Sequence, residues 1–253
     1  HVELTGEGRL LMNYALQIED LLDEMGEKLE RGDMGPGGGF RFGAIDAAII
    51  YLLPEILKRY MRVNPDVELS AQVAPSRYLV DDLLMNRSEF AVISLPYSHP
   101  KIATMPLCAD RMPLVVGGDH RFARQSRVDL EDVVKEPLLL FHADSVSRKI
   151  VDERLAEAGL QPGRVMEMRS PEAMRKLVEA GVGISFLPER VVEESAARGD
   201  LCKVEVRGVS FTRDIGIAWR RGRYFGPAIR LLLEQIVSTY GRRRFWLEEG
   251  EAP

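Results

Sequence analysis

The sequence predicts an α/β fold with mostly parallel sheets. Two observations support this: short apolar runs alternate with longer segments of helical periodicity, and a β-α-β unit opens the globular part. The expected strands are 40–45, 67–73, 90–94, 104–108, 112–117, 137–141, 164–168, 184–187, 201–206 and 213–219. The expected helices are 48–62, 76–86, 146–158, 171–180, 188–198 and 226–240.

The β-α-β unit is the first landmark of the globular part. Residues 40–45 read as a short buried strand, and a loop follows at Asp46-Ala47-Ala48. A helix with one apolar face then runs to Asn64-Pro65, and residues 67–73 resume as a strand. Ligands of open α/β sheets bind at the carboxyl ends of strands, so this loop is a candidate ligand contact.

Composition excludes several classes of protein. The chain has 253 residues and a net charge of −5, which argues against gripping nucleic acid over a broad face by itself. The two cysteines, Cys108 and Cys202, lie among apolar residues and suit inert thiols in a reducing cytosol. No apolar run is long enough to span a bilayer and no signal peptide is visible, so we expect a cytoplasmic protein without a membrane partner. Starting at His1, the chain reads as the middle of a longer sequence.

An amphipathic helix is expected over residues 4–31, with Thr5 near its start. Its apolar residues form a narrow heptad seam, typical of a dimerising coiled coil: Leu11, Ala15, Ile18, Leu22, Met25 and Leu29. The alternative is a single helix lying on its own domain. The glycine-rich segment 32–39 that follows is read as a hinge, since it lacks the Gly-Lys-Ser/Thr ending of a phosphate-binding loop.

Catalytic and metal signatures are weak. The four histidines, at positions 1, 99, 120 and 142, do not pair with one another or with cysteine at ligand-like intervals. There is no Gly-x-Ser-x-Gly elbow, and Gly181-Val182-Gly183 leads into a strand and lacks the third glycine of a dinucleotide fingerprint. We therefore expect no catalytic residue, no metal and no cofactor, and a protein that is not an enzyme.

Several motifs, taken in order, resemble those of LysR-type transcriptional regulators. Residues 178–188, Val-Glu-Ala-Gly-Val-Gly-Ile-Ser-Phe-Leu-Pro, are similar to the family phrase Val-x-Ala-Gly-x-Gly-Ile-x-x-Leu-Pro. Further likenesses are Leu4-Thr5-Gly6-Glu7-Gly8, Phe42-Gly43, Leu53-Pro54, Asn64-Pro65 and Asn86-Arg87-Ser88-Glu89-Phe90-Ala91-Val92. The resemblance runs from about residue 4 to residue 240.

This resemblance implies a two-lobe, periplasmic-binding-protein-like (type 2) effector domain preceded by a dimerising linker helix. Residues 1–35 would be linker helix and hinge, 36–116 plus 215–245 lobe I, 117–214 lobe II, and 246–253 a tail. Strands near Leu114-Val115-Val116 and Ile215-Gly216-Ile217 would cross between the lobes. The chain would sense a small metabolite in the cleft as a homodimer or homotetramer. It would act on DNA only through a winged helix-turn-helix that precedes His1 and is missing here.

The expected effector contacts lie where helices begin near strand ends, because helix N-termini suit carboxylates and phosphates. They are Asp46, Ala47, Ala48, Ser76, Arg77, Pro96, His142, Ser145, Arg148 and Ser170. Several of them have a plainer alternative: Ser76 and Ser170 as helix caps, Arg77 and Arg148 as solvated charges, and His142 as a structural hydrogen bonder.

Asp46 is the least expected of these residues, because the family loop is often uncharged and carries Ser or Thr. It either binds an ammonium group of the effector or caps the following helix. If Asp46 binds an ammonium group while the helix N-termini bind a carboxylate, the effector is zwitterionic. If Asp46 only caps the helix, the effector is anionic.

Two other functions use the same architecture. A solute-binding receptor would share the two lobes, but a monomeric receptor needs no heptad seam at 4–31. An enzyme such as a dehydratase would need a committed acid, base or nucleophile in the cleft, and the sequence offers none by name.

Overall fold

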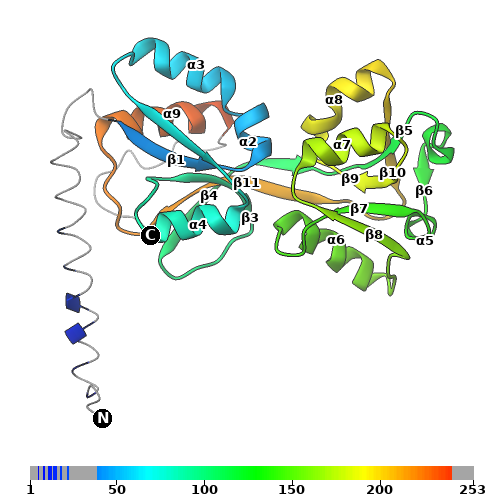
Figure 1. Ribbon diagram of the computed structural model, residues 1–253, viewed down its shortest axis with the longest axis horizontal. Coiled ribbons are helices and arrows are strands. Elements are labelled where there is room, and N and C mark those ends of the chain that lie inside the picture. Colours follow the sequence, from blue (N-terminus) through cyan, green and yellow to red (C-terminus); the bar gives the residue numbers. More distant parts are fainter. Residues whose placement is uncertain are drawn as a thin grey trace.

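The computed structural model describes Thr5, Gly8, Leu11, Met12, Tyr14, Ala15, Ile18, Leu22 and residues 39–240. Two lobes lie side by side (Figure 1), each built on its own sheet. The sheet of lobe I has the order β2-β1-β3-β11-β4, from β1 (Phe40–Ala44), β2 (Leu69–Val73), β3 (Ala91–Leu95), β4 (Ile102–Arg111) and β11 (Thr212–Arg220). The sheet of lobe II has the order β6-β10-β5-β9-β7-β8, from β5 (Leu114–Gly117), β6 (Arg127–Val128), β7 (Pro137–Phe141), β8 (Arg164–Met168), β9 (Ile184–Phe186) and β10 (Leu201–Val206). The predicted α/β class and the two lobes are confirmed.

The sheets are mixed, not mostly parallel as the alternation of elements predicted. β11 runs antiparallel to β3 and β4, and β5 runs antiparallel to β10 and β9. The reason is that the chain passes from lobe I to lobe II and later returns, so strands that follow a passage run against their neighbours. The passages lie at residues 112–113 and 207–211, between β4 and β5 and between β10 and β11.

The first predicted helix, 48–62, is two helices. α2 covers Asp46–Tyr51 and α3 covers Pro54–Val63, with Pro54 at the first position of α3. Proline lacks an N–H and clashes with the carbonyl four residues earlier, so it ends one helix and starts the next. The loop predicted at Asp46-Ala47-Ala48 is therefore the first turn of α2. Ile45 occupies its N-cap position, so Asp46 is not the cap that one reading proposed.

The remaining predicted helices are present. They are α4 (Ser76–Leu84), α6 (Val146–Glu157), α7 (Pro171–Glu179), α8 (Glu189–Arg198) and α9 (Pro227–Tyr240). The sequence reading missed strand β6, the helix α5 (Leu130–Val133) and the 3-10 turn η1 (Arg121–Arg124). Each of the three has only two to four residues, too few to show a hydrophobic period.

Separate cores hold each lobe. In lobe I, the rings of Phe42 and Phe90 stack at 5.4 Å and Phe40 meets Tyr60 edge-on, all between the sheet and its helices. In lobe II, one apolar cluster lies on each face of the sheet, one centred on Phe186 and the other on Met174. These cores fix the strand ends that face the gap between the lobes, so that gap is walled by rigid elements.

The N-terminal helix is described at a few positions. Thr5 Oγ1 accepts a hydrogen bond from the Gly8 N–H at 3.1 Å, which agrees with the expected helix start. Leu11, Ala15, Ile18 and Leu22 are helical and exposed, with Leu11 at 71%, so these four do not pack on the globular body. Met25 and Leu29 of the predicted seam, and most of hinge 32–39, lie outside the described residues. Within the described part of the chain, no helix has the length and apolar character needed to cross a membrane.

Candidate functional site: the cleft between the lobes

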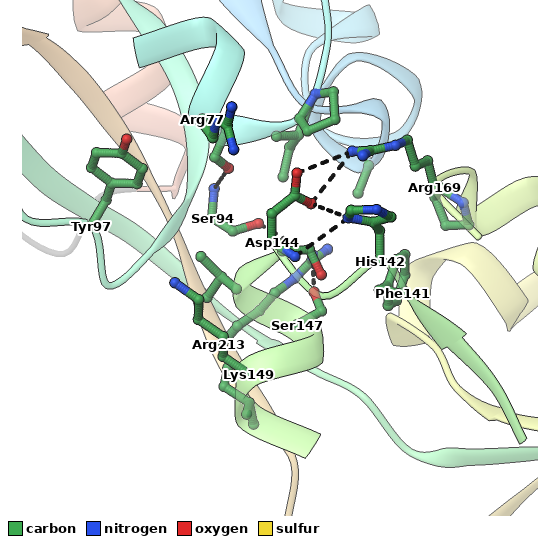
Figure 2. A pocket seen from close by; sticks show the side chains of 18 of the residues that line it. Arg77, Ser94, Tyr97, Phe141, His142, Asp144, Ser147, Lys149, Arg169 and Arg213 are labelled. Carbon is green, nitrogen blue, oxygen red and sulfur yellow. Dashed lines mark hydrogen bonds and ion pairs between the residues drawn. The ribbon is translucent and has the colours of Figure 1, made fainter. Parts of the chain in front are cut away.

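A cavity of about 510 Å³ lies between the two lobes (Figure 2). Lobe I contributes the ends of β1, β2 and β3 with the starts of α2 and α4, and lobe II contributes the ends of β7 and β8 with the starts of α6 and α7. The carboxyl ends of parallel strands thus meet across the gap, the position expected for a ligand in an α/β sheet.

Seven of the ten predicted contacts line this cavity: Asp46, Ala47, Ser76, Arg77, Pro96, His142 and Ser145. The other three do not. Ala48 is fully buried in the core of lobe I. Arg148 points its guanidinium at Asp152, Glu167 and the Phe141 carbonyl, at 2.8 to 3.1 Å. Ser170 caps α7 by accepting from the Ala173 N–H at 3.3 Å.

Four serines of the cavity are oriented by hydrogen bonds in which their side-chain oxygen is the acceptor. Ser76 Oγ accepts from the Ser94 N–H, and Ser145 Oγ accepts from the Arg148 N–H, both at 3.1 Å. Ser94 and Ser147 each accept from Arg213, at 3.2 and 2.7 Å. A hydroxyl has one proton to donate and two lone pairs, so each of these serines keeps a proton for another acceptor.

Helix N-termini from opposite lobes open onto the same space. α4 of lobe I begins at Ser76 and α6 of lobe II begins at Val146, and the first residues of both helices line the cavity. The first N–H groups of a helix have no acceptor within the helix and carry a partial positive charge. Together with the serine hydroxyls, they make the cavity rich in hydrogen-bond donors.

The charges of the lining are mixed, with cations in slight excess. Arg77, Lys149, Arg169 and Arg213 are the cations, and Asp46, Asp144 and Glu153 are the carboxylates. Figure 2 shows Asp144 between His142 and Arg169, with Asp144 Oδ1 at 2.8 Å from His142 Nδ1 and Oδ2 at 3.3 Å from Arg169. Burial acts to raise the pKa of Asp144, but the hydrogen bond from His142 and the charge of Arg169 outweigh it, so the pKa is lowered.

Asp46 differs from Asp144 in its surroundings. Burial raises its pKa, the N–H of its own residue opposes that rise, and the nearby Glu172 carboxylate adds to it. Its carboxylate thus lies in the cavity wall, and no cation of the described residues contributes to the shift of its pKa. Glu172 itself accepts a hydrogen bond from the Tyr51 hydroxyl, which ties α2 of lobe I to α7 of lobe II.

The sequence reading missed several lining residues, of which Ser94 and Arg213 are the most informative. Ser94 interrupts the buried strand Ala-Val-Ile-Ser-Leu, and Arg213 lies in a strand whose next apolar residues are fully buried. A polar side chain inside an otherwise apolar strand needs a buried partner, and that signal was available in the sequence. Among the described residues, no group of three His, Cys, Asp or Glu side chains is arranged to hold a metal ion.

Comparison with known proteins identifies the family. The family model described as "LysR substrate binding domain" matches residues 34–240. The transcriptional regulator YofA of Bacillus subtilis (strain 168) is 27% identical over 235 residues, which cover 93% of this chain and 79% of that protein.

Solved structures share the fold. The effector-binding domain of QuiR in complex with shikimate has a TM-score of 0.72 and 22% identity, covering 82% of this chain and 99% of that one. The CcmR regulatory domain of Synechocystis PCC6803 in complex with 2-PG has a TM-score of 0.74 and 20% identity, covering 81% and 98%. The fold is thus the two-lobe, periplasmic-binding-protein-like one. Since the family model covers most of the chain, this protein belongs to the LysR family, the family of these transcriptional regulators, and carries its effector-binding domain.

Proposed function

We propose that the cleft of this effector-binding domain senses a small anionic metabolite. The observation that carries the proposal is the donor-rich lining: the N-termini of α4 and α6 face one cavity from opposite lobes, together with serine hydroxyls and four cations. Such groups favour carboxylates and phosphates. A volume of about 510 Å³ suits a small molecule. The QuiR domain bound to shikimate supports the same class of ligand.

The proposed sites are the seven cavity-lining residues predicted from the sequence, joined by Ser94, Ser147 and Lys149. Ser76 and Ser145 would donate their free protons, and Arg77 and Lys149 would balance the anion's charge. An effector that binds more tightly to one relative pose of the lobes shifts the population toward that pose. The size of the shift is limited by the difference between its affinities for the two poses.

We propose that this change of pose reaches DNA through a winged helix-turn-helix preceding His1. The paired subunits of a homodimer or homotetramer, joined through the seam of the N-terminal helix, would carry it. The exposure of Leu11, Ile18 and Leu22 supports such a seam, because those side chains are left uncovered by their own subunit. As a regulator of this type, the protein would work in the cytoplasm and would not be an enzyme.

Binding of small anions tests the proposal. We expect a panel of carboxylates and phosphates to contain ligands detected by calorimetry, and Lys149→Met to weaken them about tenfold, the loss of one charged hydrogen bond. Lys135→Met is the matched control: Lys135 lies in the same lobe, pairs with Asp132 at 2.8 Å, and is outside the cavity, so its loss should leave affinity unchanged. Equal weakening by both variants would place the anion elsewhere.

The finer proposal is a zwitterionic effector, such as an amino acid, with its ammonium group on Asp46. It is motivated by a half-buried carboxylate whose pKa is raised by burial and by Glu172, since a ligand cation would relieve both effects. We expect Asp46→Ala to weaken amino acids in calorimetric titration while simple acids bind as before. Unchanged amino-acid binding in this variant rules the zwitterion out and leaves the anion proposal intact.

A further inference from the structure

Arg213 is a charged side chain held inside the protein at the start of β11. Its side chain is 6% exposed, and that of Asp110, its cross-strand partner on β4, is 3% exposed. Arg213 Nε and Nη2 both lie on Asp110 Oδ2, at 2.9 and 2.8 Å. This buried pair balances the charge and fixes the plane of the guanidinium group.

The remaining nitrogen, Nη1, reaches two hydroxyls in different lobes. It donates to Ser94 Oγ at 3.2 Å and to Ser147 Oγ at 2.7 Å, and both serines are buried. Ser94 lies on β3 of lobe I, whereas Ser147 is the second residue of α6 in lobe II. The shorter bond is thus the one that crosses between the lobes, at the wall of the cavity (Figure 2).

This bond brings two positive features together. The N-terminus of α6 carries a partial positive charge, and the guanidinium group beside it has the same sign. Asp110 compensates the guanidinium from β4 of lobe I, whereas Ser147 belongs to α6 of lobe II. An anion in the cavity would face both Arg213 and the α6 terminus, so it would stabilise the pose in which they meet.

We infer that Arg213 is a positioning residue that couples occupancy of the cleft to the relative pose of the lobes, with its bond to Ser147 as the interlobe contact favoured by the anion. The claim that an anion favours this pose rests on the proposed function. The claim that the Ser147 bond helps to set the pose of the lobes needs no ligand, so the proposed function and the positioning role can fail separately.

Two serine variants isolate the interlobe bond. Ser147→Ala and Ser94→Ala each remove one hydroxyl from the same guanidinium nitrogen, but only the first breaks a contact between lobes.

The separation of the lobes would be measured by double electron–electron resonance between spin labels at Lys58→Cys on α3 and Ala156→Cys on α6, in a full chain with Cys108 and Cys202 replaced by alanine. Inorganic phosphate is the probe anion, and its affinity would be measured in parallel by calorimetry.

We expect Ser147→Ala to broaden and lengthen the distance distribution without ligand, and to weaken phosphate about tenfold. Ser94→Ala should keep the distance distribution of the unsubstituted chain, because it leaves the interlobe bond between Arg213 and Ser147 in place. Equal shifts in both variants, or no shift in either, overturn the inference. If phosphate and the carboxylate panel fail to bind the unsubstituted chain while Ser147→Ala alone opens the lobes, the proposed function fails and the positioning role stands.

Discussion

Replacing Asp110 by asparagine is expected to cost about 3–5 kcal/mol of the free energy of unfolding, the usual loss when one member of a buried ion pair is removed. The substitution keeps the shape of the side chain and removes its charge. Arg213 would then remain 6% exposed with hydroxyls but without a carboxylate, and a buried charge without a counter-charge is strongly unfavourable. Urea unfolding followed by circular dichroism measures the change.

Two controls separate the buried charge from other effects of the substitution. Asp214→Asn makes the same change at the residue that follows Arg213 in β11. The side chain of Asp214 is exposed, so this variant should alter the free energy of unfolding by no more than about 0.5 kcal/mol. The double variant Asp110→Leu with Arg213→Met removes both charges and should recover most of the loss. A loss below about 1 kcal/mol in Asp110→Asn would show that water already solvates this guanidinium group.

Most of the fold could be predicted because its elements carry local patterns. The ten predicted strands all correspond to strands of the structure, since each is a short run of apolar or alternating apolar and polar residues bounded by polar or glycine-containing turns. The break between α2 and α3 was missed even though Pro54 marked it, because the apolar face continues from Leu52 and Leu53 before the proline to Ile56 and Leu57 after it. Here the covalent chemistry of one residue outweighs the hydrophobic period.

Only part of the cleft could be predicted. The residues that were found and those that were missed differ in how far along the chain their partners lie. Ser76 and Ser145 are found because each stands at a helix start, a local signal. Arg213 depends on Asp110 and Ser94, which are 103 and 119 residues away in the chain. Such contacts arise from the order of strands in the sheet, and no local pattern contains that order. The helix that begins at Asp46 was read as a loop because the local pattern was too short: a helix of six residues does not show its hydrophobic period.

Replacing Gly216 by alanine is expected to destabilise the protein by about 3 kcal/mol, at the upper end of the cost of overpacking. Gly216 lies at an irregularity in the pairing of β11 with β4. A Cβ atom there would press against the carbonyl oxygen of Met105 and the Leu95 Cδ1 atom, and would lie 3.1 Å from the Met105 carbonyl carbon. A side chain can rotate away, but the backbone of β4 cannot move without disturbing its ladder, so the two strands must separate.

The position of Gly216 also ties this cost to the cleft. Leu95 stands between Ser94 and Pro96, two residues of the cavity lining, so displacement of Leu95 should weaken anion binding in the fraction that folds. Gly163→Ala is the matched control, because the added Cβ meets only the Val134 carbonyl oxygen at an ordinary 3.5 Å, and its effect should stay within about 0.5 kcal/mol. Urea unfolding gives the stability of both variants, and calorimetry gives their anion affinity. If Gly216→Ala were as stable as Gly163→Ala, β4 and β11 would be able to separate without cost. β11 would then not hold Arg213 in a fixed position between Asp110 of lobe I and Ser147 of lobe II.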